Sequence, residues 1–134
     1  MREKPVETGE ELVDRFGKAL VDVFDYSLIQ LSRKLTDTGA ASSKDFLQYL
    51  VDLPEAERPL RIAQYGLETF IHDFMFMFQD SETFKIVGKL ASGEEIDLKD
   101  LCPEGLHGNQ LDWMEEHSVN RDIGALLLDK EFKQ

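Results

Sequence analysis

The feature that most constrains the fold is a helical repeat of apolar residues from about Glu10 to Leu35. Thr8 lies three residues before Glu11, the spacing of a capping box, in which both side chains bond to free backbone N–H groups of the first turn. The apolar residues recur at steps of three and four, the period of an α-helix with one buried face: Leu12, Val13, Phe16, Ala19, Leu20, Val23, Phe24, Leu28, Leu31 and Leu35. The sequence therefore predicts a long amphipathic helix with a defined start.

A second long helix is predicted over residues 60–78, after a connection and a short helix. Residues 36–43 (TDTGAASS) are small and polar, which favours a connection, and Ser43 is suited to cap a short helix that ends before Pro54. The end of the second long helix, FIHDFMFMF (70–78), is apolar almost all round, which is typical of a helix buried by several neighbours. We therefore expect residues 70–78 at the centre of the core.

A groove for a hydrophobic ligand is the alternative for this segment, because methionine is flexible and polarizable and here alternates with phenylalanine. Core filling is the preferred interpretation. The two differ in whether Phe76 and Met77 are covered by the hairpin or form an exposed apolar patch.

The next segment changes from helical to strand character. FKIVGKL and EIDL flank a glycine-containing turn, which predicts a β-hairpin over about residues 84–98 with its tip near Ser92 and Gly93. Two strands alone are marginal in water, so the hairpin must pack on the helices, pair with another strand or join a partner's sheet.

The last part of the chain predicts two short helices after a loop that contains Pro103. These helices cover about residues 111–117 and 120–132, the second with Asn120 as its cap and Phe132 facing inward. The predicted fold class is α+β and mainly helical. Two long amphipathic helices and two or three short helices pack with one β-hairpin.

At 134 residues the chain fits a single domain over residues 1–134, with residues 1–7 as a flexible N-terminal tail. The charged N-terminus lacks the apolar core of a signal sequence, and no apolar run approaches the roughly 20 residues of a spanning helix. The single cysteine, Cys102, cannot form an internal disulfide. These features predict a cytoplasmic protein.

Charge narrows the classes of partner. The chain has 27 acidic and 15 basic side chains, a net charge of −12, which repels nucleic acid phosphates and anionic membranes. We therefore expect no direct nucleic acid binding, no membrane binding and a basic protein partner, with a homodimer as a further option. Solubility alone is the simpler explanation of the charge. The sequence predicts no cofactor.

The segment Asp112 to Glu116 is the strongest signal for binding. Tryptophan and methionine are enriched at interfaces, and here acidic residues that can pair with a basic partner surround them. In the alternative, Trp113 closes one end of the core. The predicted partner-binding residues are Asp112, Trp113, Glu115 and Glu116, together with Asp97 and Asp100 from the acidic last third of the chain.

The histidines support an enzyme less well. His72 and Asp73, with His107 or His117, could converge on a metal ion, but their spacing matches no ligand pattern and a solvated acidic face explains the residues around His117. We assign no catalytic residue and no metal ligand.

The preferred hypothesis is a non-enzymatic acidic binding protein, such as an inhibitor or immunity-type protein that blocks a basic toxin or nuclease. Negative side chains then take the place of nucleic acid phosphate and speed association. One alternative is a small metal-assisted hydrolase that uses clustered His and Asp residues. Another is a structural subunit of a homo-oligomer, whose hairpins pair across a two-fold axis.

Overall fold

The structure is a computed structural model that describes residues 3–36 and 41–128, and it has a mainly helical α+β fold. The predicted fold class is therefore confirmed. The elements are the helices α1 (Gly9–Leu35), α2 (Ala41–Asp52) and α3 (Arg58–Asp80), the strands β1 (Val87–Lys89) and β2 (Glu95–Asp97), the helices α4 (Gln110–His117) and α5 (Ile123–Leu128), and the 3-10 segments η1 (Glu55–Glu57), η2 (Leu98–Leu101) and η3 (His107–Asn109).

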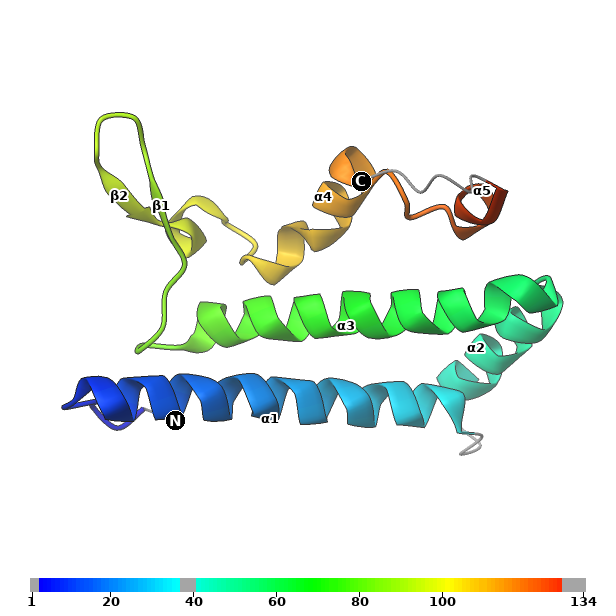
Figure 1. Cartoon of the computed structure of the whole chain (residues 1–134), viewed down its shortest axis with the longest axis horizontal. Helices are drawn as coiled ribbons and strands as arrows, with labels where there is room; N and C mark the ends of the chain where they lie inside the picture. Colours follow the sequence, from blue (N-terminus) through cyan, green and yellow to red (C-terminus); the bar gives the residue numbers. More distant parts are fainter. Residues whose placement is uncertain (1–2, 37–40, 129–134) are drawn as a thin grey trace.

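The elements form three layers, with α3 in the middle (Figure 1). α1 and α3 lie side by side and antiparallel, and α2 joins them at one end. The hairpin, α4 and α5 lie along the other side of α3. Among the described residues, no helix combines the length and the apolar character needed to cross a membrane.

α1 begins and ends where the sequence predicts. The Thr8 hydroxyl accepts a hydrogen bond from the Glu11 backbone N–H at 3.1 Å, and the Glu11 carboxylate accepts one from the Glu7 N–H at 3.3 Å. Arg33 and Lys34 occupy the last turn, where positive charge suits the negative end of the helix dipole.

Ser43 does not cap α2, so that prediction is wrong. It lies inside α2 and is 2% exposed, and its hydroxyl oxygen is 3.0 Å from the Arg33 carbonyl oxygen and 3.2 Å from that of Lys34. The carbonyl oxygen of Thr36 is also a hydrogen-bond partner. The last carbonyls of a helix lack partners within the helix. The Ser43 hydroxyl has one proton to donate, so it bonds to one of these carbonyls at a time and ties α2 to the end of α1.

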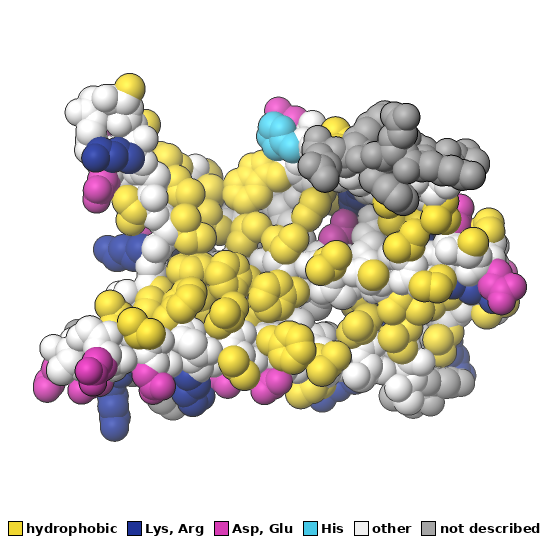
Figure 2. Space-filling view, viewed as in Figure 1, with side chains coloured by type: hydrophobic (Ala, Val, Ile, Leu, Met, Phe, Trp, Pro, Cys, Tyr) yellow, Lys and Arg dark blue, Asp and Glu magenta, His cyan; other side chains and the backbone are white. Residues whose placement is uncertain are grey.

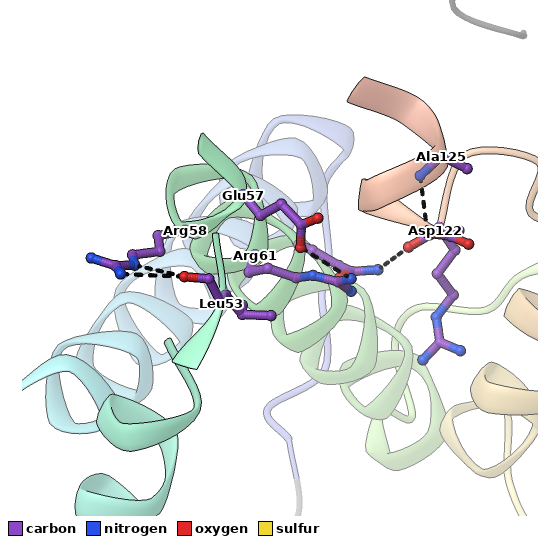
Figure 3. Close-up of polar contacts among 8 residues, drawn as sticks. Leu53, Glu57, Arg58, Arg61, Asp122 and Ala125 are labelled. Carbon is purple, nitrogen blue, oxygen red and sulfur yellow. Dashed lines mark hydrogen bonds and ion pairs between the residues drawn. The ribbon is translucent and has the colours of Figure 1, made fainter. Parts of the chain in front are cut away.

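The corner between α2 and α3 is held by the first residue of α3. The Arg58 guanidinium donates to the Val51 carbonyl at 3.1 Å. It also donates to the Leu53 carbonyl at 3.2 Å (Figure 3). These are again carbonyls from the end of a helix. Nearby in the chain, Leu50 is only 6% exposed and anchors α2 to the interior.

The hairpin is shorter than predicted but has the expected tip. β1 and β2 pair antiparallel with Gly88 opposite Ile96, and Gly93 takes a φ of 92°, which favours glycine. The Leu98 N–H donates to the Ile86 carbonyl at 2.9 Å and extends the pairing beyond the strands.

The last helix begins later than predicted. Asp122, not Asn120, caps α5, because its carboxylate accepts from the Ala125 N–H at 3.1 Å (Figure 3). The predicted inward-facing Phe132 lies outside the described residues.

The interior is small for a chain of this length. Among the described residues, the buried large apolar side chains are Leu50, Phe78, Leu106 and Ile123. The expectation that residues 70–78 form the centre of the core is only partly correct, since Phe78 is 8% exposed but Phe76 is 49% exposed. Phe76 packs against the ring of His107, not under the hairpin, with the ring centroids 5.0 Å apart.

Candidate protein-binding site

α4 is attached to α3 through hydrogen bonds from side chains to backbone. The buried Gln110 side chain donates to the Glu68 carbonyl of α3 at 2.8 Å. In return, the Gln79 side chain of α3 accepts from the Leu106 N–H at 3.1 Å, and Leu106 itself is 3% exposed. The start of α4 is therefore held on α3 by two hydrogen bonds, one accepted by a backbone carbonyl of α3 and one by a side chain of α3.

The segment after α4 is attached in the same way. The Arg121 guanidinium pairs with the Glu68 carboxylate at 2.9 Å, and the Gln64 side chain donates to the Arg121 carbonyl at 2.9 Å. Ile123 follows and is 5% exposed. Both ends of α4 are thus anchored, and Met114 turns toward the groove that separates α4 from α3.

The outer surface of α4 carries the predicted binding residues. Asp112, Glu115 and Glu116 are exposed. Trp113 is 37% exposed, so it neither seals the core nor stands free of the protein. Leu111 adds a 55% exposed apolar side chain. At about 100° per residue, Leu111 and Trp113 lie about 200° apart around the helix, with the three carboxylates between them. The helix therefore presents an acidic strip with Leu111 on one flank and Trp113 on the other.

Among the described residues, the carboxylates on α4 have no neighbouring lysine or arginine partner. Within residues 3–36 and 41–128, none of the three pairs with a lysine or arginine, and Glu116 lies 3.8 Å from the ring of the exposed His117. Within the described part of the chain, their negative charge is therefore not compensated by an ion pair with lysine or arginine.

The other two predicted residues lie elsewhere. Asp97 and Asp100 lie at the start of η2 and within it, and the Asp97 carboxylate accepts from the Lys99 N–H at 3.2 Å. That bond gives Asp97 a local capping role. Figure 1 places the hairpin and the segment after it in a different part of the upper layer from α4. The structure thus gathers Asp112, Trp113, Glu115 and Glu116 on one helix and leaves Asp97 and Asp100 beside the hairpin.

Acidic side chains also occur away from α4. Figure 2 shows Asp and Glu side chains along the lower edge of the molecule over α1, near the hairpin and above α4. What distinguishes α4 is the exposed tryptophan among the acids.

Two of the three histidines lie close together, which the sequence did not predict. The rings of His72 on α3 and His107 on η3 have centroids 5.2 Å apart. Asp73 lies between two partners, with its oxygens 3.3 Å from His72 Nδ1 and 2.8 Å from the Ser27 hydroxyl. No local motif signals this contact, because it depends on how the segment before α4 docks on α3.

This arrangement is not that of an activated serine. The Ser27 hydroxyl bonds to the Asp73 carboxylate and is only 6% exposed, whereas a nucleophilic serine is open to its substrate and is most often bonded to a histidine. Among the described residues, no group of three or more His, Cys, Asp and Glu side chains is arranged to hold a metal ion. His117 lies on α4, next to Glu116. A groove of about 550 Å³ adjoins His72 and Asp73, and its apolar walls include Tyr26, Phe76 and Met77.

Comparisons with protein-family models, with curated proteins and with solved structures find no match to this chain.

Proposed function

We propose that this protein is a non-enzymatic binding protein that uses the outer surface of α4 to bind a basic partner, as an inhibitor or immunity-type protein would bind a toxin or nuclease. The observation that carries the proposal is the 37% exposed Trp113 among three exposed carboxylates that have no lysine or arginine partner in the described part of the chain. The reducing cytoplasm is the proposed compartment, since the chain has a single cysteine.

The two kinds of group contribute differently. The carboxylates attract a positive partner over roughly 8–10 Å at physiological salt and so raise the association rate. Trp113 buries a large area at little cost in side-chain entropy, and residues of this type dominate binding energy at interfaces. The anchors at both ends of α4 keep this surface in place before the partner arrives, which lowers the cost of ordering it.

The test compares three forms of the full chain as baits in a lysate of the native cell at low salt. They are the wild type, the triple variant Asp112→Asn, Glu115→Gln, Glu116→Gln, and a control triple variant Glu10→Gln, Asp45→Asn, Glu94→Gln. Both variants remove three negative charges from exposed positions, so they differ only in where the charge is lost.

A protein retained by the wild type is identified by mass spectrometry, purified and titrated at 50 and 200 mM salt. We expect at least a tenfold loss of affinity in the α4 variant, little change in the control, and weaker binding at the higher salt. Equal affinity for all three forms, or binding that does not depend on salt, would contradict the proposal.

The hydrolase alternative has a single contact in its favour, the pair His72 and His107. Purified protein that retains a divalent metal in stoichiometric amount, and loses it on His72→Ala, would favour this alternative over the binding function.

A further inference from the structure

α1 has two apolar stripes, and only one of them faces α3. The first includes Phe16, whose ring lies 6.5 Å from that of Phe78, and Ser27, which bonds to Asp73. The second lies beside it and stays open. Its members are 73%, 55%, 54% and 49% exposed: Val13, Val21, Phe24 and Leu28. The last three follow one another at steps of three and four residues, as on one face of a helix. Val13 lies eight residues before Val21, with Gly17 halfway between them on the same face.

The open stripe continues onto α3. Phe24 and Leu28 form one wall of a groove of about 490 Å³, and Leu67 and Phe70 of α3 form the other. Leu67 is 66% exposed. No Asp, Glu, Lys or Arg lines this groove. Figure 2 shows hydrophobic side chains gathered over α1 and α3 on the face in view.

The surface of the whole chain is larger than a monomer of this size requires. It exposes 9933 Å², whereas a folded monomer of 15.4 kDa exposes about 7,200 Å². The surplus of about 2,700 Å² is comparable to the roughly 1,000–2,500 Å² that each subunit of an obligate homodimer buries. This surplus is the sum over the whole chain, including residues outside the described ranges, so it allows an interface of this size without locating it.

We propose that this face binds a second copy of the same chain, with the two α1 helices antiparallel across a two-fold axis between Leu20 and Val21. This register places Phe24 of one copy opposite Gly17 of the other, and Val13 opposite Leu28. Gly17 is exposed and has free space where a Cβ would be. The bulkiest side chain of the stripe thus meets the position without a side chain, as close packing of two helices requires.

Charge also favours a second copy over a basic partner on this face. The open stripe carries no carboxylate for a basic protein to pair with. Two copies, each of net charge −12, can meet here because their charges lie outside the contact. In the antiparallel register, the same flank of both helices meets. Lys18, which pairs with Asp22 of its own helix at 2.8 Å, there comes near Asp25 of the other copy. Two symmetry-related contacts between opposite charges then border the open stripe.

The first experiment measures the mass of the full chain by sedimentation equilibrium between 1 and 200 µM. We expect a dimer for the wild type, loss of the dimer in Phe24→Asp and in Leu28→Asp, and a retained dimer in Ile29→Asp. Ile29 is a matched control because it is 48% exposed on the same helix but turned about 140° from Phe24, at about 100° per residue. Far-UV circular dichroism checks that each variant folds.

The second experiment tests the register with cysteine variants in a Cys102→Ser background. A mixture of Val13→Cys and Leu28→Cys proteins should be linked by a short bifunctional maleimide several times faster than either protein alone. A wild type that is monomeric over the whole range would overturn the proposal, as would a dimer that survives both aspartate variants. Faster linking within either single variant than in the mixture would overturn the antiparallel register. None of these results involves α4, so they are separate from the test of the basic partner.

Discussion

The two sides of α3 are held by different forces. Toward α1 the contact is mainly apolar, with the Phe16, Phe78 and Phe74 rings in sequence and one polar bond between Ser27 and Asp73. Toward α4 the contacts are mainly bonds from glutamine side chains to backbone groups, with Leu106 as the buried apolar anchor.

The two kinds of contact contribute differently: apolar packing supplies most of the free energy of association, and hydrogen bonds fix the relative position of the elements. Apolar packing is not directional and scales with the area removed from water, so it decides that α1 and α3 associate. A hydrogen bond contributes only about 0.5–1.5 kcal/mol but fixes the position of its partners. On the α4 side, hydrogen bonds that each contribute little free energy therefore hold the outer surface of α4 in a defined position.

The largest expected loss of stability comes from a comparison of two phenylalanines, the buried Phe78 of α3 and the exposed Phe24 of α1. Phe78→Ala empties a buried position and should cost about 3–5 kcal/mol of unfolding free energy, measured by urea denaturation. Phe24→Ala removes an exposed ring, so it should lower the melting temperature at high protein concentration, where the proposed dimer forms, and leave it unchanged when dilute. An equal drop at all concentrations would place Phe24 in the interior of the single chain.

The next effect tests the apolar anchor on the other side of α3. Leu106→Ala should cost about 2–5 kcal/mol, because the side chain is 3% exposed and its loss leaves a cavity. Leu111→Ala serves as the control, since this residue is 55% exposed and should change stability by no more than about 0.5 kcal/mol. Similar losses in both variants would show that α4 is packed differently.

The polar bond within the apolar side should give a smaller effect. Ser27 is 6% exposed, and Ser27→Ala removes its bond to a carboxylate, for an expected loss of about 1.5–3 kcal/mol. Ser32→Ala, at an exposed position on the same helix, is the control and should be close to neutral. A neutral Ser27→Ala would mean that water replaces the hydroxyl.

The smallest effect concerns the N-terminal segment and depends on pH. The Glu3 carboxylate accepts from the Thr83 hydroxyl, from the Ser81 hydroxyl at 2.9 Å and from the Thr83 N–H at 2.9 Å. The bond from the Thr83 side chain is the main cause that lowers the Glu3 pKa below 4.5, while partial burial opposes it. The flexibility predicted for residues 1–7 is a separate property and stays a prediction.

Because the pKa of Glu3 is lowered on folding, its contribution is present above pH 4.5 and is lost as the pH falls through the lower folded value. Glu3→Gln should therefore lower the melting temperature slightly at pH 7, and the difference from the wild type should shrink in acid. Glu10→Gln is the matched control. A difference that grows as the pH falls would contradict this assignment.

The predictable part of the structure was the part set by periodicity. The repeat at three and four residues gave α1 and α3, and the spacing of Thr8 and Glu11 gave the start of α1. The hairpin tip followed from Gly93. These signals are local, so the sequence alone carries them.

What could not be predicted depends on tertiary contacts. The role of Ser43 follows from the return of the chain toward the end of α1, and the pair His72 and His107 follows from how η3 docks. The exposure of Phe76 has the same origin, because a helix that is apolar all round is fully buried only if enough elements cover it. α1 lies on one side of α3 and the hairpin, α4 and α5 lie along the other (Figure 1), and part of the surface of α3 remains exposed.

The bonds of Gln64, Gln79 and Gln110 also impose an order of assembly. Each joins the α4 region either to a side chain carried by α3 or to a carbonyl of α3, so its partner is in position only once α3 has formed. Each of the helices between residues 9 and 80 can form by contacts within itself, and α1 and α3 then pair through contacts such as that of Phe16 with Phe78. In native-state deuterium exchange, amides of α4 should then exchange earlier than those of α3, through openings that leave the long helices intact.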